Sequence, residues 1–403
     1  MVAIRHRSKE SSLNVLEKLD TTVTFSDHER LLLESVRRLA TQRIAPRAAG
    51  YDESGAFPWD NISDINALGL NSMFVPEEYG GTGLSYSVYL ACCREISKAC
   101  ASTGIVWATN FHGTGPIVDF ASHEQKERWL PRIAGGALVA LALTEPSAGS
   151  DATGMKTVFR PDGDDIVIDG SKVFITNGDV CDYLVLFGKW APLGSGKEAI
   201  SIVVVEKGTP GLNVVRTENK MGTRASSTAA LAFDGCRIPR SNLLGEPGAG
   251  LTMLFHFLNR SRPSVAAHAL GIARAAFEDA VQYTNERSQS GRRILENQGI
   301  QFMVADMATD LAMCERWLWH VARRIEEGEN DISQESSMLK MRASDLAVRI
   351  STDAVQLFGG YGYTKDFRVE RLMRDSKITQ IWEGTNQIHR QLIGRSFLAK
   401  KRG

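Results

Sequence analysis

The chain has 403 residues, a length for which two or three domains are expected. Its 47 basic and 47 acidic side chains cancel, so nothing in the charge points to a nucleic acid partner. No apolar run approaches the length of a membrane span, and 43% hydrophobic residues are typical of a globular protein. The six cysteines form no Cys-x-x-Cys pair and no His/Cys ligand spacing, which predicts reduced thiols in a cytoplasmic protein and no metal site.

Residues 1–137 are expected to form a helical domain. The stretch 26–29, Ser-Asp-His-Glu, matches a capping box and precedes apolar residues at helical spacing. We expect this helix to end at Pro46 or shortly before it, because a proline inside a helix removes a backbone hydrogen bond. A further helix is expected to open at Ser122 and to stop at Pro131.

From 138 to 245 the apolar residues repeat every second position, which predicts strands at 171–176, 183–189, 199–206, 212–216 and 228–238. Short strands at regular spacing favour a closed barrel or a sandwich. From 246 to 403 long amphipathic helices with short connections predict a bundle. The expected fold class is therefore α+β: an N-terminal helical domain, a middle β-barrel domain and a C-terminal four-helix bundle.

The stretch 380–390, Gln-Ile-Trp-Glu-Gly-Thr-Asn-Gln-Ile-His-Arg, places Glu383 between Trp382 and a helix-breaking Gly384. Thr385 can then cap the helix that follows. A carboxylate held in such a break, close to apolar residues, could serve as a general base near neutral pH. Taken by itself, the spacing favours a partly exposed glutamate in an inter-helix turn.

The stretch 144–151, Thr-Glu-Pro-Ser-Ala-Gly-Ser-Asp, joins an apolar strand to a turn that is rich in hydroxyl groups. Its small side chains would let backbone N–H groups approach a phosphate or a flat ring, although a plain Ser/Gly turn explains it too. Gly-Gly-Tyr-Gly at 359–362 follows a helix and not a strand. It therefore predicts a helix C-cap and a turn, not a dinucleotide fingerprint.

Together these motifs resemble the acyl-CoA dehydrogenase family, from about Phe25 to Lys400. The stretch 144–151 resembles the first signature of the family, and 380–390 resembles the second. Other segments match in the same order: Phe174-Ile-Thr-Asn-Gly178, Arg262-Pro263, Asp353-Ala-Val-Gln-Leu-Phe-Gly-Gly360 and Leu372-Met-Arg-Asp375. The family architecture of N-terminal helices, middle β-barrel and C-terminal four-helix bundle agrees with the expected fold class.

The resemblance implies a reaction as well as a fold. Glu383 takes the position of the base that removes the α-proton of an acyl-CoA thioester, while the β-hydrogen leaves as hydride to N5 of FAD. Some branched-chain members carry the base just before the arginine of the Arg-Pro pair, where this chain has Ser261. The family's usual electron acceptor is an electron-transferring flavoprotein, and its usual assembly is a homotetramer.

The resemblance also implies FAD contacts from several parts of the chain. Those near the flavin ring are Leu141, Leu143, Thr144, Gly149, Ser150, Phe174, Ile175 and Thr176. Arg287 and Gln298 would hold the pyrophosphate and adenosine end, and Thr385 and Gln387 complete the set beside the base. Gln356, Gly359 and Gly360 would reach the FAD of a neighbouring subunit. Substrate or CoA contacts are implied for Ser150, Asn259, Arg262 and Gly384.

Two other classes of function stay open at this point. One is a flavin-dependent oxidase or enoyl-CoA reductase on the same fold. The other is a catalytically silent scaffold. The acyl group is not fixed by the sequence, and we expect its pocket to be shaped by Glu95 and by residues 103–113.

Overall fold

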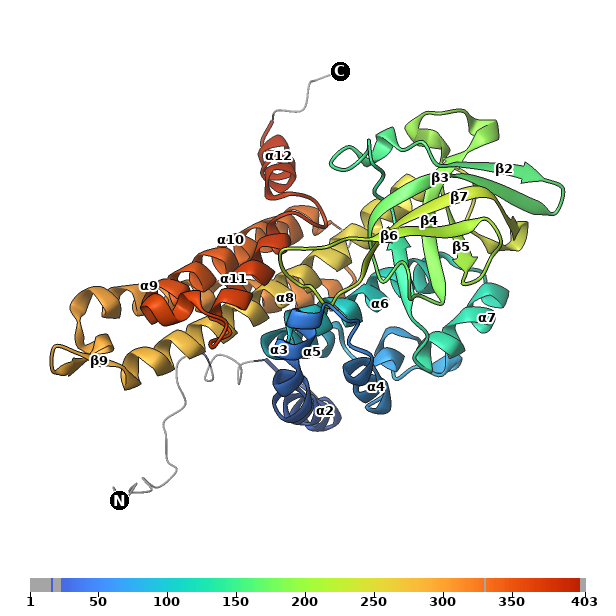
Figure 1. Ribbon diagram of the computed structural model, residues 1–403. Coiled ribbons are helices and arrows are strands. Elements are labelled where there is room, and N and C mark those ends of the chain that lie inside the picture. Colours follow the sequence, from blue (N-terminus) through green and yellow to red (C-terminus); the bar gives the residue numbers. More distant parts are fainter. Residues whose placement is uncertain (1–15, 17–22, 330, 399–403) are drawn as a thin grey trace.

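The computed structural model describes residue 16, residues 23–329 and residues 331–398, which form three domains in chain order (Figure 1). Helices form the first domain, an eight-stranded sheet the second, and long helices the third, which confirms the predicted fold class. Within these ranges, no helix combines the length and apolar character that a bilayer crossing requires. The same ranges hold no cluster of His, Cys, Asp and Glu side chains suited to a metal ion.

The N-terminal domain consists of α2 (Asp27–Leu39), α3 (Ala45–Ser54), α4 (Trp59–Ala67), α5 (Tyr86–Ala99), α6 (Ala101–Phe120) and α7 (His123–Ala134). The predicted capping box opens α2, with Ser26 Oγ accepting from the Glu29 N–H and the Glu29 carboxylate accepting from the Ser26 N–H. These two reciprocal bonds satisfy N–H groups that an uncapped helix would leave without partners.

Both prolines that were expected to end helices lie within helical chain. A π-helical turn, Ala40–Ile44, leads directly into α3, where Pro46 occupies the first turn. Proline suits the first turn of an α-helix, because its fixed φ is already the helical one. Pro131 lies inside α7, which continues to Ala134 because the buried side chains of Leu130 and Ile133 hold its last turn against the interior.

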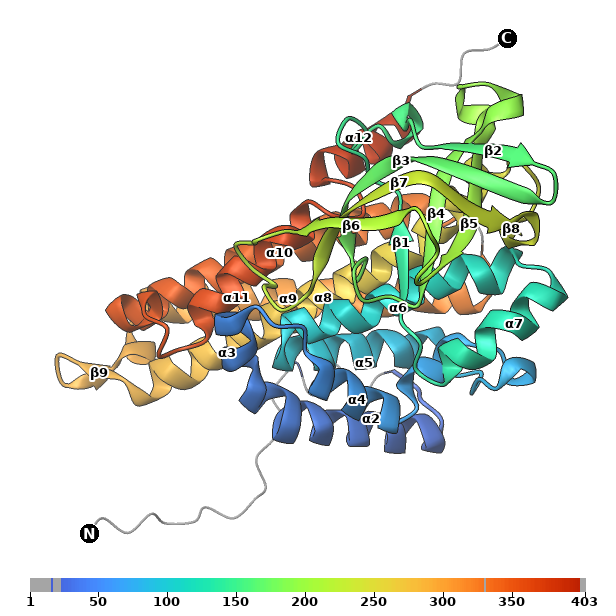
Figure 2. The ribbon, with the colours of Figure 1, turned by 45° about the vertical axis from the view of Figure 1, so that its right-hand side comes forward.

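The middle domain is one sheet with the strand order β6-β7-β3-β2-β4-β5-β8, and β1 pairs with β4 in parallel. The strands are β1 (Val139–Ala142), β2 (Val158–Asp162), β3 (Asp165–Thr176), β4 (Tyr183–Trp190), β5 (Ile200–Glu206), β6 (Leu212–Thr217), β7 (Thr228–Pro239) and β8 (Leu243–Leu244). Apart from β1–β4 and a short β2–β4 pair, neighbouring strands are antiparallel. Figure 2 shows the sheet above α6, the helix that packs against β1.

The C-terminal domain contains α8 (Gly250–Glu286), α9 (Gln298–Glu326), α10 (Ser333–Phe358), α11 (Val369–Ser376) and α12 (Asn386–Ser396). A small hairpin of β9 (Ser288–Gln289) and β10 (Arg292–Arg293) joins α8 to α9 at the far end of the bundle (Figure 1). The middle of α8 is buried on all sides, since α5 and α6 pack on one flank and α10 on another. One helix therefore runs from its packing against α5 and α6 to the outer end of the bundle.

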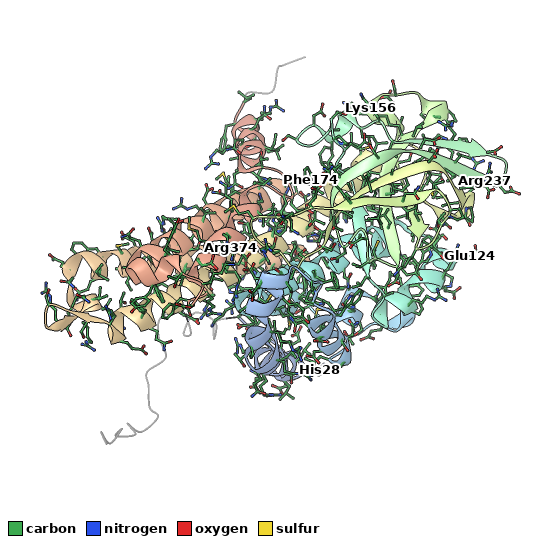
Figure 3. The ribbon with its side chains drawn as sticks, viewed as in Figure 1. His28, Glu124, Lys156, Phe174, Arg237 and Arg374 are labelled. Carbon is green, nitrogen blue, oxygen red and sulfur yellow. The ribbon has the colours of Figure 1, made fainter. Side chains whose placement is uncertain are left out.

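Arg374 on α11 ties the three domains together (Figure 3). Its guanidinium donates to Asp52 of α3 at 2.7 Å, to Glu370 of its own helix at 2.7 Å, and to the carbonyl oxygen of Met221 in the middle domain at 3.0 Å. A planar guanidinium can serve such divergent acceptors at once because its N–H groups point outward in a fixed fork. This contact fixes how α11 meets both other domains.

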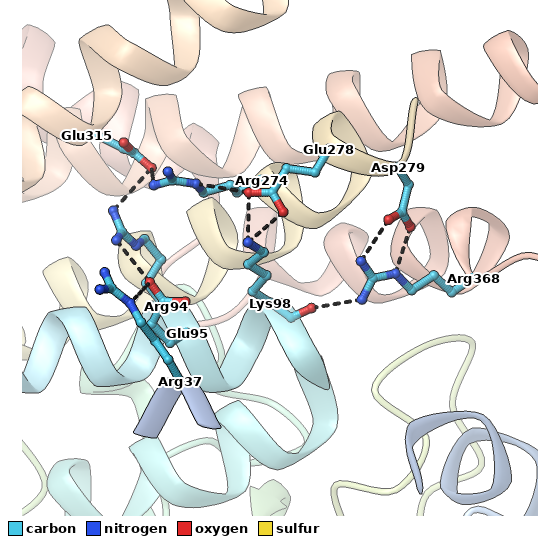
Figure 4. Close-up of polar contacts among 9 residues, drawn as sticks. All are labelled: Arg37, Arg94, Glu95, Lys98, Arg274, Glu278, Asp279, Glu315 and Arg368. Carbon is cyan, nitrogen blue, oxygen red and sulfur yellow. Dashed lines mark hydrogen bonds and ion pairs between the residues drawn. The ribbon is translucent and has the colours of Figure 1, made fainter. Parts of the chain in front are cut away.

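A second polar cluster lies buried between α5, α8 and α9 (Figure 4). Glu315 of α9 is only 1% exposed and accepts from Arg94 at 3.3 Å and from Arg274 at 3.1 Å. Arg94 also contacts Glu95, which pairs with Arg37 of α2. Glu95 therefore belongs to this charge cluster, and the expectation that it shapes an acyl pocket finds no support in its contacts.

Asp375, which follows Arg374 on α11, should make the stability of the protein depend on pH. Its carboxylate is buried and accepts a hydrogen bond from the Thr223 N–H, and burial raises its pKa to about 6 from the ordinary value of 3.8. A raised carboxyl pKa means that the folded protein binds the proton more tightly, so this group lowers the free energy of unfolding as pH rises from about 4 to 6. The Asp375→Asn variant should lose this dependence on pH, so that between pH 4 and 6 its free energy of unfolding rises by about 3 kcal/mol relative to that of the wild type. Thermal unfolding of both proteins at pH 4, 5, 6 and 7 measures this difference, and stability curves that run parallel over this range would contradict the prediction.

Candidate active site

Glu383 lies in a strained turn between two helical segments. The chain leaves α11 through a 3-10 turn, Lys377–Gln380, and α12 begins after Thr385, whose side chain accepts from the Ile388 N–H as predicted. Between them Glu383 has a φ of 53° and Gly384 a φ of 92°. A left-handed conformation costs roughly 1–2 kcal/mol for a residue other than glycine, and such residues cluster at functional sites.

The two oxygens of the Glu383 carboxylate face different partners. Ser261 Oγ on α8 donates to Oε2 at 2.9 Å, and Nδ1 of His112 on α6 lies 3.6 Å from Oε1. The carboxylate side chain is 16% exposed, so it is accessible but largely enclosed. Ser261 occupies the position that the resemblance gives for an alternative base. In this chain it supports the carboxylate of Glu383 by a hydrogen bond.

Two buried cations lie near this carboxylate. Arg262 on α8 donates to Ser337 Oγ at 3.2 Å, and burial lowers its pKa while Glu383 opposes that shift. Lys340 on α10 donates to the Gly384 carbonyl oxygen at 2.7 Å and to Asn386 Oδ1 at 3.1 Å. Burial lowers the pKa of Lys340 to about 7. These contacts hold the turn that carries Glu383 from the side of the bundle.

The Gly384→Ala variant should displace the carboxylate. An added Cβ would meet His389 Nε2 at 3.2 Å, and the φ of 92° is one that alanine rarely adopts. A shift of the turn by about 1 Å costs roughly 100-fold in the rate of the chemical step. Gly394→Ala is the matched control: Gly394 lies inside α12 with no atom near its added Cβ, so that change should stabilise the helix by about 0.5–1 kcal/mol. The test compares single-turnover rates and thermal unfolding of both variants, and equal effects would argue against a special role for Gly384.

Buried polar atoms without a partner among the described residues surround Glu383. They are Tyr89 Oη, Arg262 Nε, His268 Nε2 and Trp382 Nε1. A buried polar group is normally hydrogen-bonded, and an unpaired one costs about 1–3 kcal/mol. Tyr89 and His268 come from α5 and α8, and Trp382 precedes the base directly. This concentration of unsatisfied donors is what a ligand-binding interior would show.

An aromatic cluster lies on α5 and α6 beside His112. Tyr89 stacks on Phe111 with ring centroids 4.4 Å apart, Phe74 packs against both rings, and Trp107 packs against Tyr89. Residues 103–113, expected to shape the acyl pocket, lie on α6, and most of them are buried. The segment thus contributes an apolar wall and, through His112, a contact with Glu383.

Phe174, one of the residues predicted to contact a flavin ring, lies near the C-terminal end of β3, on the side of the middle domain that faces the bundle (Figure 3). Phe174 has a φ of 60° and lies at an irregularity in the pairing of β3 with β7. Its ring is 64% exposed, which is unusual for a large apolar side chain. Ile175 is buried and Thr176 half-buried beside it, and Gly149 and Ser150 are exposed in the neighbouring turn. Leu141, Leu143 and Thr144 are half-buried below them.

A buried ion pair that sequence reasoning missed holds β3 and the turn at 144–151 together. Lys172 Nζ donates to Glu145 Oε1 at 2.8 Å and to the Leu143 carbonyl oxygen at 2.9 Å. Glu145 also accepts from the N–H groups of Lys156 and Thr157. Burial alone would raise the pKa of Glu145, but Lys172 and these hydrogen bonds lower it. The pair is therefore ionised at neutral pH and anchors the turn at 144–151 to β3.

Two predicted groups lie at the other end of the bundle: the residues for the adenosine end of FAD, and those expected to reach the FAD of a neighbouring subunit. Arg287 of the first group and Gln356, Gly359 and Gly360 of the second line a cavity of about 560 Å³, and Arg287 lies over the ring of Tyr361. Gln298 begins α9 nearby, outside that lining. The 25 residues from Arg262 to Arg287 along α8 span roughly 38 Å. One chain therefore does not bring this cavity close to Glu383.

The remaining predicted positions fall near Glu383. Thr385 caps α12, Gln387 is exposed on its first turn, and Asn259 is half-buried on α8 just before Ser261. No sequence signal marked His112, because its polar partners Ser264 and Glu383 lie more than a hundred positions away along the chain.

Comparison with known proteins finds matches in all three domains, between residues 26 and 398. Models of the N-terminal, middle and C-terminal domains of acyl-CoA dehydrogenases match residues 26–137, 140–236 and 248–398. An acyl-CoA dehydrogenase of Bacillus subtilis (strain 168) is 43% identical over 370 residues, which cover 91% of this chain and 97% of that protein.

Two solved structures are similar in fold. Butyryl-CoA dehydrogenase from Megasphaera elsdenii aligns with a TM-score of 0.90 at 34% identity, covering 94% of this chain and 100% of that one. A glutaryl-CoA dehydrogenase from Mycobacterium smegmatis in complex with FADH2 aligns with a TM-score of 0.88 at 29% identity, covering 96% and 98%. Fold and sequence define the chain as an oxidoreductase of the kind that acts on acyl-CoA thioesters. It belongs to the acyl-CoA dehydrogenase family, whose members are flavoproteins.

Proposed function

We propose that the protein oxidises an acyl-CoA thioester to the trans-2-enoyl-CoA with FAD as cofactor and Glu383 as the base. The observation that carries this proposal is the enclosed Glu383 carboxylate. Ser261 orients it, and buried polar atoms that have no partner among the described residues lie around it. A base positioned in this way can take a weakly acidic α-proton within a site that excludes water.

The charges around Glu383 suit the reaction. Removal of the α-proton develops negative charge on the thioester oxygen, which preorganised donors and nearby cations stabilise. Arg262 and Lys340 supply buried positive charge beside the base, and Arg262 Nε and Trp382 Nε1 offer donors that the described part of the chain leaves without a partner. When bound, FAD supplies the acceptor for the β-hydride.

The residues present fit FAD in two separate groups. The exposed ring of Phe174 would hold the flavin end, together with Leu141, Leu143, Thr144, Gly149, Ser150, Ile175, Thr176, Thr385 and Gln387. The cavity at Arg287, with Gln298, Gln356, Gly359 and Gly360, would hold the adenosine end of the FAD bound to another subunit, because it lies too far from Glu383 of its own chain. We therefore propose a homo-oligomer, in keeping with the tetramer that the resemblance implies.

The electron acceptor, the acyl group and the cytoplasmic location are further parts of this proposal. We propose an electron-transferring flavoprotein as acceptor and Ser150, Asn259, Arg262 and Gly384 as substrate or CoA contacts. The two similar structures are named butyryl-CoA dehydrogenase and glutaryl-CoA dehydrogenase. Short acyl chains are therefore the first to test.

Anaerobic titration of the flavin with a panel of acyl-CoAs tests the function. The panel includes straight, branched, cyclic, aromatic and dicarboxylic acyl groups, with butyryl-CoA and glutaryl-CoA first. We expect at least one of these acyl-CoAs to bleach the flavin absorption band at roughly 450 nm. Oxygen consumption with substrate alone would favour an oxidase, and purified protein without flavin absorbance would favour a scaffold.

A further inference from the structure

His112, which no sequence motif marks, lies beside the base in the interior of the protein. Its Nδ1 is 3.6 Å from Glu383 Oε1, and its Nε2 is 2.7 Å from Ser264 Oγ on α8. The ring is buried, and it meets Phe111 and Phe257 edge to face. Its orientation is therefore fixed by packing on two sides and by a hydrogen bond on a third.

Ser264 determines which nitrogen of His112 carries the proton. Ser264 Oγ has one hydrogen and donates it to the Ser261 carbonyl oxygen at 2.7 Å, because a carbonyl can only accept. In its contact with His112, Ser264 Oγ must therefore accept, and Nε2 must donate. Burial lowers the pKa of His112 although Glu383 acts against it, so the resting ring is neutral. Nδ1 then presents a lone pair to Glu383.

The distances agree with this assignment. The Ser261 hydroxyl, which has a proton to donate, lies 2.9 Å from Glu383 Oε2, whereas His112 Nδ1 stays 3.6 Å from Oε1. Two lone pairs that face each other do not form a hydrogen bond. A single proton placed on Oε1 would turn the contact into an O–H···N bond after an approach of about 1 Å.

We propose that His112 is a positioning residue that accepts a hydrogen bond from Glu383 once the base has taken the α-proton, so that the proton is held between Oε1 and Nδ1. This inference rests on the function proposed above. In the reaction the α-C–H bond breaks and an O–H bond forms at Glu383. The electron pair left behind becomes the second bond between the α- and β-carbons as the β-hydrogen leaves with its electron pair to oxidised flavin. The acyl chain is oxidised and the flavin reduced, and His112 stabilises the protonated base.

Other titratable groups face this pair from every neighbouring element: Tyr89 and Cys93 on α5, Arg262 and His268 on α8, Lys340 on α10 and His389 on α12. Burial lowers the pKa of both His268 and His389 to about 3 and raises that of Cys93 to about 12, so none of the three titrates near neutral pH. Lys340, with a pKa lowered by burial to about 7, does. The Lys340→Met variant therefore accompanies the pH measurements.

Two substitutions of His112 separate its two contacts. The amide of glutamine reaches the position of Nε2 and can still donate to Ser264, but it leaves no acceptor opposite Glu383. The amide of asparagine occupies the position of Nδ1 and can still accept from Glu383, but it loses Ser264. We expect His112→Gln to slow single-turnover flavin bleaching by about 10- to 100-fold at saturating acyl-CoA, and His112→Asn to slow it less. The acid limb of the pH–rate profile should move to lower pH in His112→Gln, in the wild-type and Lys340→Met backgrounds alike, because the protonated base has lost its acceptor.

A second measurement does not depend on flavin reduction. The 3-thia analogue of a bleaching acyl-CoA has sulfur in place of the β-carbon, so it can exchange its α-protons with D2O but cannot donate a hydride. Mass spectrometry should show exchange slowed by a similar factor in the holoenzyme of His112→Gln. If His112→Asn slows both flavin bleaching and α-proton exchange more than His112→Gln does, His112 acts only through Ser264 and the inference is wrong.

Failure of this inference is distinguishable from failure of the proposed function. If no acyl-CoA bleaches the wild-type flavin, the function and the inference fall together. If the wild type is bleached, but His112→Gln keeps the wild-type rate, pH profile and α-proton exchange, only the role of His112 is refuted. Flavin content and thermal unfolding are measured for each variant, and should one of the two fail to fold, the other still decides by its rate and pH profile.

Discussion

The Glu383→Gln variant should bind FAD and acyl-CoA but reduce its flavin at least about 1,000-fold more slowly than the wild type. Glutamine has nearly the same shape as glutamate. Its amide oxygen can still accept a hydrogen bond from Ser261 Oγ, which lies 2.9 Å from the carboxylate of Glu383. What it lacks is a group that can take a proton near neutral pH. Anaerobic stopped-flow mixing with an acyl-CoA that bleaches the wild type measures this effect.

Ser261→Ala is the matched control for that experiment. It removes the hydrogen bond to the carboxylate but leaves the base in place, so we expect a loss of only about 10-fold. A Glu383→Gln variant that reduces flavin at the wild-type rate would show that the base is another residue. A Ser261→Ala variant as slow as Glu383→Gln would instead assign Ser261 a direct part in the chemistry.

The largest effect on stability is expected from Glu315→Ala, by about 3–5 kcal/mol in the free energy of unfolding. The carboxylate of Glu315 is 1% exposed and accepts from both Arg94 and Arg274 in the cluster of Figure 4. Removing it leaves two guanidinium groups in the interior without their main counter-charge, and the cost of burying a charge then falls on the folded state. Thermal and urea unfolding of the holoenzyme measure the change.

Glu278→Ala provides the comparison within the same cluster. Glu278 pairs with Lys98 and Arg274, but its side chain is 37% exposed, so water can replace the lost partner. Its removal should cost less than about 1 kcal/mol. If both variants lose the same stability, burial does not decide the strength of these ion pairs.

Local signals were sufficient for the parts of the fold that short segments determine. The capping box before α2 and the cap at Thr385 depend on contacts three residues apart, which a sequence displays directly. The break at Gly384 is of the same kind. The predictions for Pro46 and Pro131 were wrong because a proline is tolerated where the first turn or outside packing replaces the missing hydrogen bond.

The surroundings of the base could not be predicted in this way. Ser261 and Glu383 are 122 positions apart, and His112 and Ser264 are 152 apart, so only the packing of α6, α8 and the turn before α12 brings them together. The same is true of the buried pair of Glu145 and Lys172, which joins the turn at 144–151 to β3. Periodicity reveals which face of a helix is buried, but not which helix covers it. The roles of the individual site residues stay predictions.

The length of α8 has a genetic consequence. Because this helix separates the cavity at Arg287 from Glu383, a chain damaged at one end still carries the other half-site intact. In the proposed oligomer, a subunit with Glu383→Gln would offer a sound adenosine pocket to its neighbour, and a subunit with a ruined pocket would still supply a working base. Two inactive alleles of this gene would then restore activity to each other in a mixed oligomer, whereas two alleles damaged in the same half would not.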